Sequence, residues 1–263
     1  MDALPSQYHE EAVPWLGRVI RCRWTQRISA TGSLVQRVVP DACADVIVDD
    51  DGAAVLVGPA TTVDLPLLRA GATLWGLRIR PEAIGAVLGV PADELTDRSL
   101  PLDAILPCSV ARGLTELATD PCLVTEPTPG PIAARLVDTP IDERVRRAVD
   151  GLLASAGTLG PICDDAFLSG RHLRRRMLEE VGLGPKLVQR IGRLQRFLAL
   201  AESQGHPYRL AWLAQAAGYA DQAHLNREVR ALAGVTPREL LSERARATLA
   251  TAGSGSDAAA RVG

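Results

Sequence analysis

The side chains best suited to chemistry in this sequence lie in two short segments of its C-terminal half. Residues 170–186 carry a run of arginines with one histidine and one lysine, and residues 222–230 combine glutamine, histidine, asparagine and arginine. Arginine can pair bidentately with guanine, and glutamine or asparagine can pair with adenine. The candidate residues are Arg171, His172, Arg174, Arg175, Lys186, Gln222, His224, Asn226, Arg227 and Arg230.

A plainer explanation of these side chains stands beside the first. Arginines on one side of a helix are most often a solvated surface. His172 and His224, each taken alone, are more typical of packing or capping residues than of ligands. The elements that carry the two segments must decide between these explanations.

The two segments follow one plan, which makes them an internal repeat. Aligned at an offset of 52 residues, each copy predicts a helix, a tight turn, a second helix ended by glycine and a third helix begun by proline. Before the turn the offset is 51, because the second copy is one residue longer there. The pattern predicts a helix-turn-helix in each copy. The matched pairs are His172 with His224, Leu173 with Leu225, Arg175 with Arg227, Gly182 with Gly234 and Pro185 with Pro237.

Start and stop signals define the second unit closely. Its first helix is predicted at Leu210–Ala217, and Asp221 is a candidate N-cap for a second helix that runs to Ala233. Gly234 can adopt the left-handed conformation that ends a helix. Thr236–Glu239 is a capping-box pattern with proline at its first helical position, so another helix starts at once. In the first unit the same roles fall to Ser169, Gly182 and Pro185.

Helical periodicity places the candidate residues opposite an apolar stripe or near the helix start. The connecting helix, from Pro185 to about Ser203, would be ~28 Å long at 1.5 Å per residue. One turn of DNA is ~34 Å, so this spacer suits two recognition helices in successive major grooves. Phosphate contacts are expected from the connecting helix, through Lys186, Arg190, Arg193 and Arg196.

The stretch GYADQAHLNREVRALAGVTPREL, from Gly218 to Leu240, resembles the signature of AraC-type transcriptional regulators. The resemblance covers about Ile141 to Arg246. It implies a DNA-binding domain of two helix-turn-helix units joined by one helix. The sequence departs from the family at Glu228 and Val229, where an aromatic is frequent, and this puts the interior packing there in question. By the resemblance, the groove-facing residues are Arg171, Arg174 and Arg175 in the first unit and Gln222, His224 and Arg227 in the second.

The first 130 residues have a different character. Short runs with β character alternate with turn signals, and Asp49–Gly52 is typical of a hairpin turn. Short helices are predicted at Glu82–Leu88 and around Val110–Leu117. VPDACADVIV, GLRIRPEAIGAVLGVPADEL and the nearby tryptophans resemble the sensor domain of a subset of these regulators, which implies a regulatory domain without an established ligand. The β runs are RVIRCRW, SLVQRVV, ADVIV, AAVLVG and TLWGLRI.

Composition and charge set further limits. A chain of 263 residues is long enough for two domains with separate cores. Residues 1–130 have 10 basic and 17 acidic side chains, a net charge of −7, whereas residues 131–263 have 19 and 14, a net charge of +5. A basic half can bind a polyanion although the whole chain has a charge of −2.

No apolar run reaches the ~18 residues of a membrane span, and the N-terminus lacks a signal-peptide pattern. A cytoplasmic location without membrane association is therefore predicted.

An enzyme is the main rival for the N-terminal half. Asp41, Asp45 and Asp49–Asp51 could form a carboxylate site, but a solvated acidic hairpin also explains them. The sequence has no phosphate-binding glycine loop, GxSxG or HExxH motif. The five cysteines are scattered, without the spacing of metal ligands; they suit core positions, with a thiol sensor as the alternative. Some AraC-type modules are fused to a DNA-repair domain with cysteine nucleophiles, but the cysteines here lack the ligand cluster that would accompany them. The other rival is a protein that coats DNA without reading its sequence, and such a protein should be basic throughout. This chain instead concentrates its positive charge on two helices and combines it with Gln222, His224 and Asn226.

The sequence therefore predicts an α+β chain of two domains. A mostly β regulatory domain is expected at 1–130, a linker at 131–140, an all-α double helix-turn-helix domain at 141–248 and a disordered tail at 249–263. The predicted function is that of a sequence-specific transcription factor with no catalytic activity, metal or cofactor. The alternative is a small enzyme or repair domain tethered to DNA.

The partners that follow are double-stranded DNA and RNA polymerase. A small-molecule effector and a second copy of the chain are left open. The resemblance implies activation as the commoner mode, with repression as the other.

Overall fold

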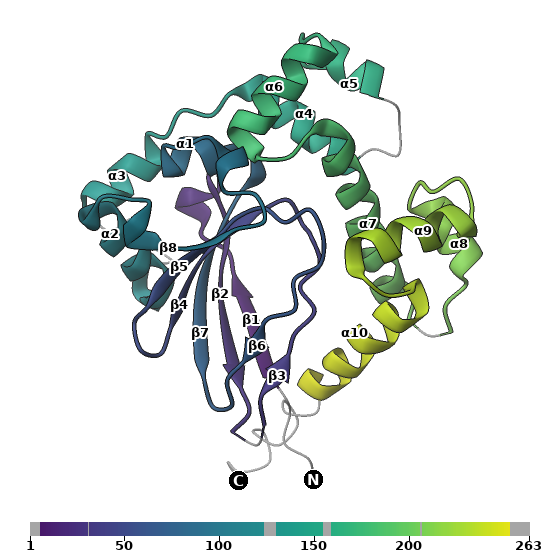
Figure 1. Ribbon diagram of the computed structural model, residues 1–263, viewed down its shortest axis with the longest axis horizontal. Coiled ribbons are helices and arrows are strands. Elements are labelled where there is room, and N and C mark those ends of the chain that lie inside the picture. Colours follow the sequence, from purple (N-terminus) through teal and green to yellow (C-terminus); the bar gives the residue numbers. More distant parts are fainter. Residues whose placement is uncertain (1–5, 31, 124–129, 155–158, 206, 253–263) are drawn as a thin grey trace.

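The computed structural model of the chain places an antiparallel sheet beside the helices that follow it in sequence (Figure 1). The structure describes residues 6–30, 32–123, 130–154, 159–205 and 207–252. Within these ranges every strand precedes residue 102, and seven helices without a strand follow Pro140. The predicted α+β division, β-rich first and helical second, is confirmed.

Six strands form the main sheet in the order β1-β2-β7-β4-β5-β8. A separate ribbon pairs β3 with β6. The hairpin turn at Asp49–Gly52 is confirmed: it joins β4 to β5, and Gly52 N–H donates to Asp49 O at 3.0 Å with a left-handed φ of 81° at Gly52. The strands are β1 (Ser6–Glu11), β2 (Ile20–Ile28), β3 (Leu34–Val35), β4 (Ala44–Asp49), β5 (Ala54–Val57), β6 (Leu67–Leu68), β7 (Thr73–Ile79) and β8 (Ser99–Pro101).

The sequence pattern missed three of these strands and overstated one. The run SLVQRVV contributes only the two residues of β3 to regular pairing. Strand β1 is a polar edge strand with no apolar alternation to announce it. Strands β6 and β8 have two and three residues, too few for any periodicity to show.

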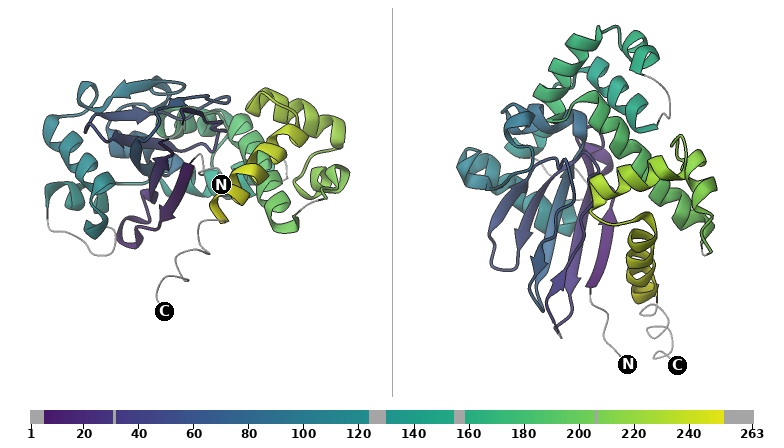
Figure 2. Two further views of the ribbon diagram at one scale, coloured as in Figure 1. Left: turned by 90° about the horizontal axis from the view of Figure 1, so that it is seen from below. Right: turned by 45° about the vertical axis from the view of Figure 1, so that its right-hand side comes forward.

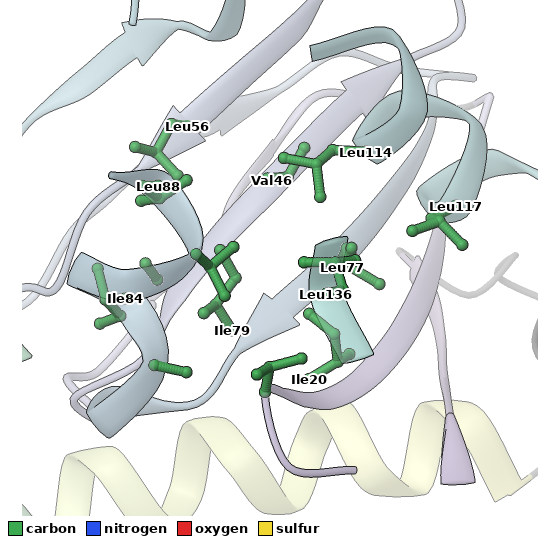
Figure 3. Packing of buried hydrophobic residues seen from close by; sticks show 14 of the residues in the cluster. Ile20, Val46, Leu56, Leu77, Ile79, Ile84, Leu88, Leu114, Leu117 and Leu136 are labelled. Atoms are coloured by element: carbon green, nitrogen blue, oxygen red, sulfur yellow. The ribbon is translucent and has the colours of Figure 1, made fainter. Parts of the chain in front are cut away.

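One face of the sheet carries the N-terminal core. In β4 the residues Ala44, Val46 and Val48 are buried at alternate positions, as a strand with one covered face requires. Leucines and isoleucines of α1 (Ile84–Leu88), α2 (Cys108–Thr119) and α3 (Pro131–Val137) pack on this face (Figure 3). The two short helices predicted in this half are therefore confirmed.

The opposite face of the sheet holds a partly buried polar cluster. Trp24 Nε1 donates to Asp45 Oδ1 at 2.7 Å, and Arg78 Nε donates to the same oxygen at 3.2 Å. Burial raises the pKa of Asp45, although Arg78 opposes that rise. The indole lies so close to Gly76 that a Cβ there would fall 1.9 Å from the ring.

The C-terminal helices form two cores that share one helix. Helix α7 contributes Val188 and Ile191 to the core of α4 to α6, and Leu194 and Phe197 to the core of α8 to α10. Among the described residues, no helix combines the length and apolar character needed to cross a bilayer. The helices are α4 (Glu143–Ala154), α5 (Leu159–Asp165), α6 (Gly170–Val181), α7 (Pro185–Gln204), α8 (Leu210–Ala216), α9 (Gln222–Ala233) and α10 (Pro237–Ala252).

The helices enclose one end and one side of the sheet. Helices α4 to α6 lie across the end nearest α1, and α10 passes along β1 (Figures 1 and 2). The structure thus brings the sheet into contact with both helix-turn-helix units.

Two details differ at the segment between the halves. Helix α3 lies inside the predicted linker 131–140, and its Leu136 belongs to the N-terminal core. Thr139 followed by Pro140 has the sequence pattern of an N-cap and first helical residue, but α4 begins later, at Glu143. Asp142 caps it by accepting from Arg144 N–H at 2.9 Å. Thr139, two residues beyond the end of α3, donates instead from Oγ1 to Arg135 O of that helix at 2.8 Å.

The predicted tail at 249–263 begins within a helix. Helix α10 runs to Ala252, and residues 253–263 lie outside the described residues. The domain limits derived from the sequence remain predictions.

Candidate nucleic-acid interface

Both helix-turn-helix units have the same backbone geometry in the turn. The N–H of Leu168 donates to the carbonyl five residues earlier at 3.0 Å, and the N–H of Tyr219 does the same at 2.9 Å. Each is preceded by a left-handed residue, Phe167 with φ 52° and Gly218 with φ 88°. These matches confirm the repeat and its offset of 51 residues before the second helix.

The starts of α6 and α9 are capped alike. Ser169 Oγ accepts from His172 N–H at 3.3 Å, and Asp221 Oδ1 accepts from His224 N–H at 2.6 Å. Each bond satisfies a backbone donor that the first turn of a helix leaves unpaired. Both caps predicted from the sequence are confirmed.

The ends of these helices and the start of the next also match the prediction. Gly182 and Gly234 have left-handed φ angles of 81° and 73°. Thr236 Oγ1 accepts from Glu239 N–H at 3.3 Å, and Glu239 Oε2 accepts from Thr236 N–H at 2.8 Å. This reciprocal pair is the expected capping box.

In the first unit the candidate side chains gather on the exposed N-terminal half of α6. Arg171, His172, Arg174 and Arg175 are all exposed. Arg175 contacts His172 Nε2 at 3.3 Å and lies 3.7 Å from a carboxylate oxygen of Glu179. Within the described ranges, Arg171 and Arg174 make no hydrogen bond or ion pair, so their guanidinium groups are available to an anion.

In the second unit α9 exposes a less charged surface. Gln222, Arg227 and Arg230 are exposed, and Asn226 is half-buried. Gln222, Asn226 and Arg227 have no hydrogen-bond partner among the residues that the structure describes. Donors and acceptors in this arrangement suit hydrogen bonds to base edges.

His224 differs from its neighbours because its ring contacts its own unit. Ala220 N–H donates to His224 Nδ1 at 3.2 Å, and the ring meets Tyr219 edge to face with centroids 5.4 Å apart. His224 Nε2 lies 3.5 Å from Glu228 Oε1. This geometry favours the packing explanation for His224 over base contact.

Glu228 accounts for the departure from the family pattern. Its carboxylate accepts hydrogen bonds from Arg190 Nε at 3.2 Å and from Arg193 Nη2 at 2.8 Å. The Arg193 guanidinium also lies over the ring of Tyr219. Burial alone would raise the pKa of Glu228, but the hydrogen bonds and charge of Arg193, with the charge of Arg190, hold that pKa below its ordinary value. Val229 is fully buried in the unit's core. An ion-pair cluster and a small apolar residue therefore replace the aromatic.

The phosphate contacts expected from α7 need correction. Arg190 and Arg193 neutralise Glu228, and Arg196 donates to the carbonyls of Ala217 at 2.8 Å and Leu153 at 3.1 Å. These three arginines hold the units together, since each is within reach of a partner that the sequence pattern did not reveal. Lys186 is exposed and without such a partner in the described part of the chain.

Arg176 is a further residue whose role only the structure shows. It pairs with Asp142 at 2.9 Å and with Glu180 at 3.0 Å, and so ties α6 to the start of α4. Its charge is neutralised there, unlike the charges of Arg171 and Arg174.

The acidic hairpin is held by an arginine. Arg69 Nη2 donates to Asp50 at 2.8 Å and to Asp51 at 3.2 Å. This pairing favours the structural explanation of Asp49–Asp51 over a catalytic carboxylate site.

Comparison with known families assigns the helical half. A family described as a helix-turn-helix domain matches residues 162–246, which contain both turns, α6, α7 and α9. The helical half therefore contains a helix-turn-helix domain of the AraC type. A second family, described as a domain of unknown function (DUF6597), matches residues 11–101, which include most of the sheet.

Several solved structures are similar to this chain at low identity. A DNA-binding transcriptional dual regulator from Escherichia coli K-12 is 24% identical, with 40% of this chain and 92% of that chain covered and a TM-score of 0.33. ToxT from Vibrio cholerae O395 is 11% identical over 90% of this chain and 97% of that chain, with a TM-score of 0.41. Unsaturated fatty acid-bound ToxT from strain SCE256 is 13% identical over 82% and 96%, with a TM-score of 0.38. No curated protein matches the chain.

Proposed function

We propose that the protein is a sequence-specific transcription factor that binds bacterial promoter DNA in the cytoplasm. Helices α6 and α9 would be its recognition helices, each entering the major groove with its N-terminal half. The observation that carries the proposal is the repeated, capped pair of helices whose N-terminal halves carry arginine, glutamine and asparagine side chains with no partner among the described residues.

The length of the shared helix supports two-groove binding. Helix α7 has 20 residues and therefore a length of about 30 Å. Successive major grooves on one side of DNA are about 34 Å apart. A single chain would then read two elements about one helical turn apart.

The two recognition helices would make unequal contributions. Arg171, Arg174 and Arg175 give the α6 surface a local positive charge, whereas Gln222, Asn226 and Arg227 give the α9 surface more varied hydrogen-bonding groups. We expect α6 to supply more of the attraction to phosphate and α9 more of the discrimination between bases.

The sheet domain, residues 1–130 by the sequence boundary, would be regulatory and would act without catalysis. RNA polymerase is the protein partner that a promoter-binding regulator of this kind requires. A small-molecule effector and a second copy of the chain are the other partners in this proposal.

Selection of bound sequences from random duplex DNA tests the function. The full chain should enrich a motif with two elements about 10 bp apart. If the chain binds all duplexes equally, and its affinity depends on the salt concentration but not on the sequence, the protein does not read sequence and instead coats DNA.

A further inference from the structure

The sheet domain contacts the C-terminal end of both recognition helices. At α6, Thr96 Oγ1 donates to Gly182 O at 2.9 Å. At α9, Arg37 Nη1 donates to Ala233 O at 2.7 Å, next to Gly234. Because Gly182 and Gly234 occupy equivalent places in the repeat, the sheet domain holds the two units at the same point.

Two segments of the sheet domain lie against both units, and we name residues 37–42 and 59–63 the brace. The segments are joined at one end, where Val38 and Asp64 exchange two backbone hydrogen bonds of 3.0 Å. Each segment reaches both units. In the first segment, Arg37 and Val39 contact the second unit, and Ala42 lies in the core of the first unit. In the second segment, Pro59 lies beside Gly182 of the first unit, and Thr62 and Val63 lie at the end of α9 in the second unit.

Polar contacts attach the brace firmly to the second unit. Besides its bond to the α9 carbonyl, Arg37 pairs with Glu243 of α10 at 2.7 Å. Thr62 Oγ1 donates to Ala231 O at 3.2 Å. A guanidinium at the last carbonyls of a helix both satisfies an unpaired acceptor and favours the negative end of the helix dipole.

The brace also contacts the shared helix and is fixed within its own domain. Gln195 Nε2 of α7 donates to Pro40 O at 2.6 Å. Thr61 N–H and Oγ1 each donate to a carboxylate oxygen of Asp97 at 2.7 Å. At Gly58 the backbone approaches so closely that a Cβ would lie 1.9 Å from Leu95 O. The brace therefore has little freedom to move relative to the sheet.

We infer that the brace determines the spacing between the two DNA elements that the protein accepts. This inference rests on the proposed function. Helix α7 is one connection between the units, and the brace is a second connection beside it. Two connections resist the twisting and bending that one helix of about 30 Å allows. Arg37 and Thr62 are thus positioning residues, because they act on DNA through the placement of the two units.

The test measures binding against spacing with the full chain. Once selection has given the preferred site, duplexes are made in which the two elements are moved apart or together by 1 or 2 bp. A shift of 2 bp turns one element by about 70° around the duplex. The wild-type chain should lose on the order of tenfold or more in affinity at that shift. The double variant Arg37→Ala/Thr62→Ala should lose less than about threefold in affinity at the same 2 bp shift. Its base preference within each element should be unchanged.

The matched control is Arg69→Ala, which removes one guanidinium from the same domain but only from the Asp50 and Asp51 carboxylates of the hairpin. It should keep the wild-type spacing profile. If the double variant does not fold, as judged by thermal unfolding, Thr62→Ala/Gln195→Ala weakens the brace while leaving the Arg37–Glu243 pair intact.

The outcomes separate this inference from the proposed function. A spacing profile that stays parallel to wild type in the brace variants would overturn the inference alone, since the contacts would then contribute only to stability. A wild-type chain that selects no sequence would overturn the proposed function and the inference with it. A flattened profile in the brace variants, with the control unchanged, would establish the positioning role.

Discussion

At the scale of residues, the two turns meet one backbone requirement with different side chains. The turn needs a left-handed residue, which Gly218 provides at little cost and Phe167 provides with an aromatic side chain that remains 78% exposed. A bulky residue with positive φ is unfavourable by about 1–2 kcal/mol. The packing of the unit therefore imposes the turn on Phe167, because nothing in that side chain favours it.

Arg227 is the residue with which base reading is tested most directly. Replacing it with alanine should cost ~1–3 kcal/mol on the selected site and relax the preference at one base pair. The reason is that Arg227 is exposed on α9, with no intramolecular partner in the described part of the chain. Binding of the variant to single-base variants of the site, measured at fixed salt, gives the readout.

Lys186→Ala is the contrast to Arg227→Ala. A phosphate contact carries no sequence information, so this variant should weaken binding evenly across sequences and lower the salt slope by about 1. An Arg227 variant that behaves in the same way as the lysine variant would show that Arg227 contacts phosphate only.

At the scale of elements, α7 and α9 are held together by charge as well as by apolar packing. Glu228 and Arg193 have side chains only 12% exposed, and each is the other's principal partner. Removing one member of such a pair leaves the other charge poorly solvated. The arginines of α7 therefore have a structural role that an arginine count along the sequence would assign to DNA.

The Glu228 cluster predicts a pH dependence of stability. Because the pKa of Glu228 is lower in the folded chain than in the unfolded chain, its contribution is fully present above the unfolded value of about 4.3 and is lost as pH falls through the folded pKa. Glu228→Gln should reduce the acid-induced fall in the unfolding free energy over this window. Urea unfolding between pH 3 and 6 would show it, and an unchanged slope in the variant would contradict it.

At the scale of the whole molecule, the sheet domain and the helical domain form one interlocked structure. Gly182 has positive φ, and a Cβ there would lie 2.7 Å from both Ala92 O and Thr96 Oγ1. At Gly234, also with positive φ, the nearest atom is the flexible Cγ1 of Val63 at 3.2 Å. The two equivalent glycines thus differ only in how closely the sheet domain approaches them.

Gly182→Ala should therefore destabilise the chain more than Gly234→Ala. Both variants incur about 1 kcal/mol for a left-handed alanine, and the first adds about 1–3 kcal/mol because backbone and side-chain atoms must move apart. Chemical denaturation of the full chain measures the difference. Equal losses would mean that the domains separate readily at α6.

Local signals in the sequence predicted the helical half well. Caps at Ser169 and Asp221, glycine stops at Gly182 and Gly234, and the capping box at Thr236 act within four residues of chain, so residue identity alone specifies them. The AraC-type resemblance rests on the same punctuation. The start of α4 is less well specified by local signals, because Thr139 and Asp142 are both competent caps, and in the structure Asp142 caps the helix.

Only the tertiary structure decided which cations are available to DNA and how the domains meet. Arg193 and Arg176 look like Arg171 and Arg174 in the sequence, yet the first two are neutralised by carboxylates that lie 35 and 34 residues away. The brace joins residues more than 150 positions apart, such as Arg37 with Ala233. Local propensity acts over one or two turns of chain, whereas a salt bridge or a domain contact depends on where the whole fold places each partner. The sequence by itself therefore determined helices α6 and α9 with their caps and stops, and the fold determined what these helices are anchored to.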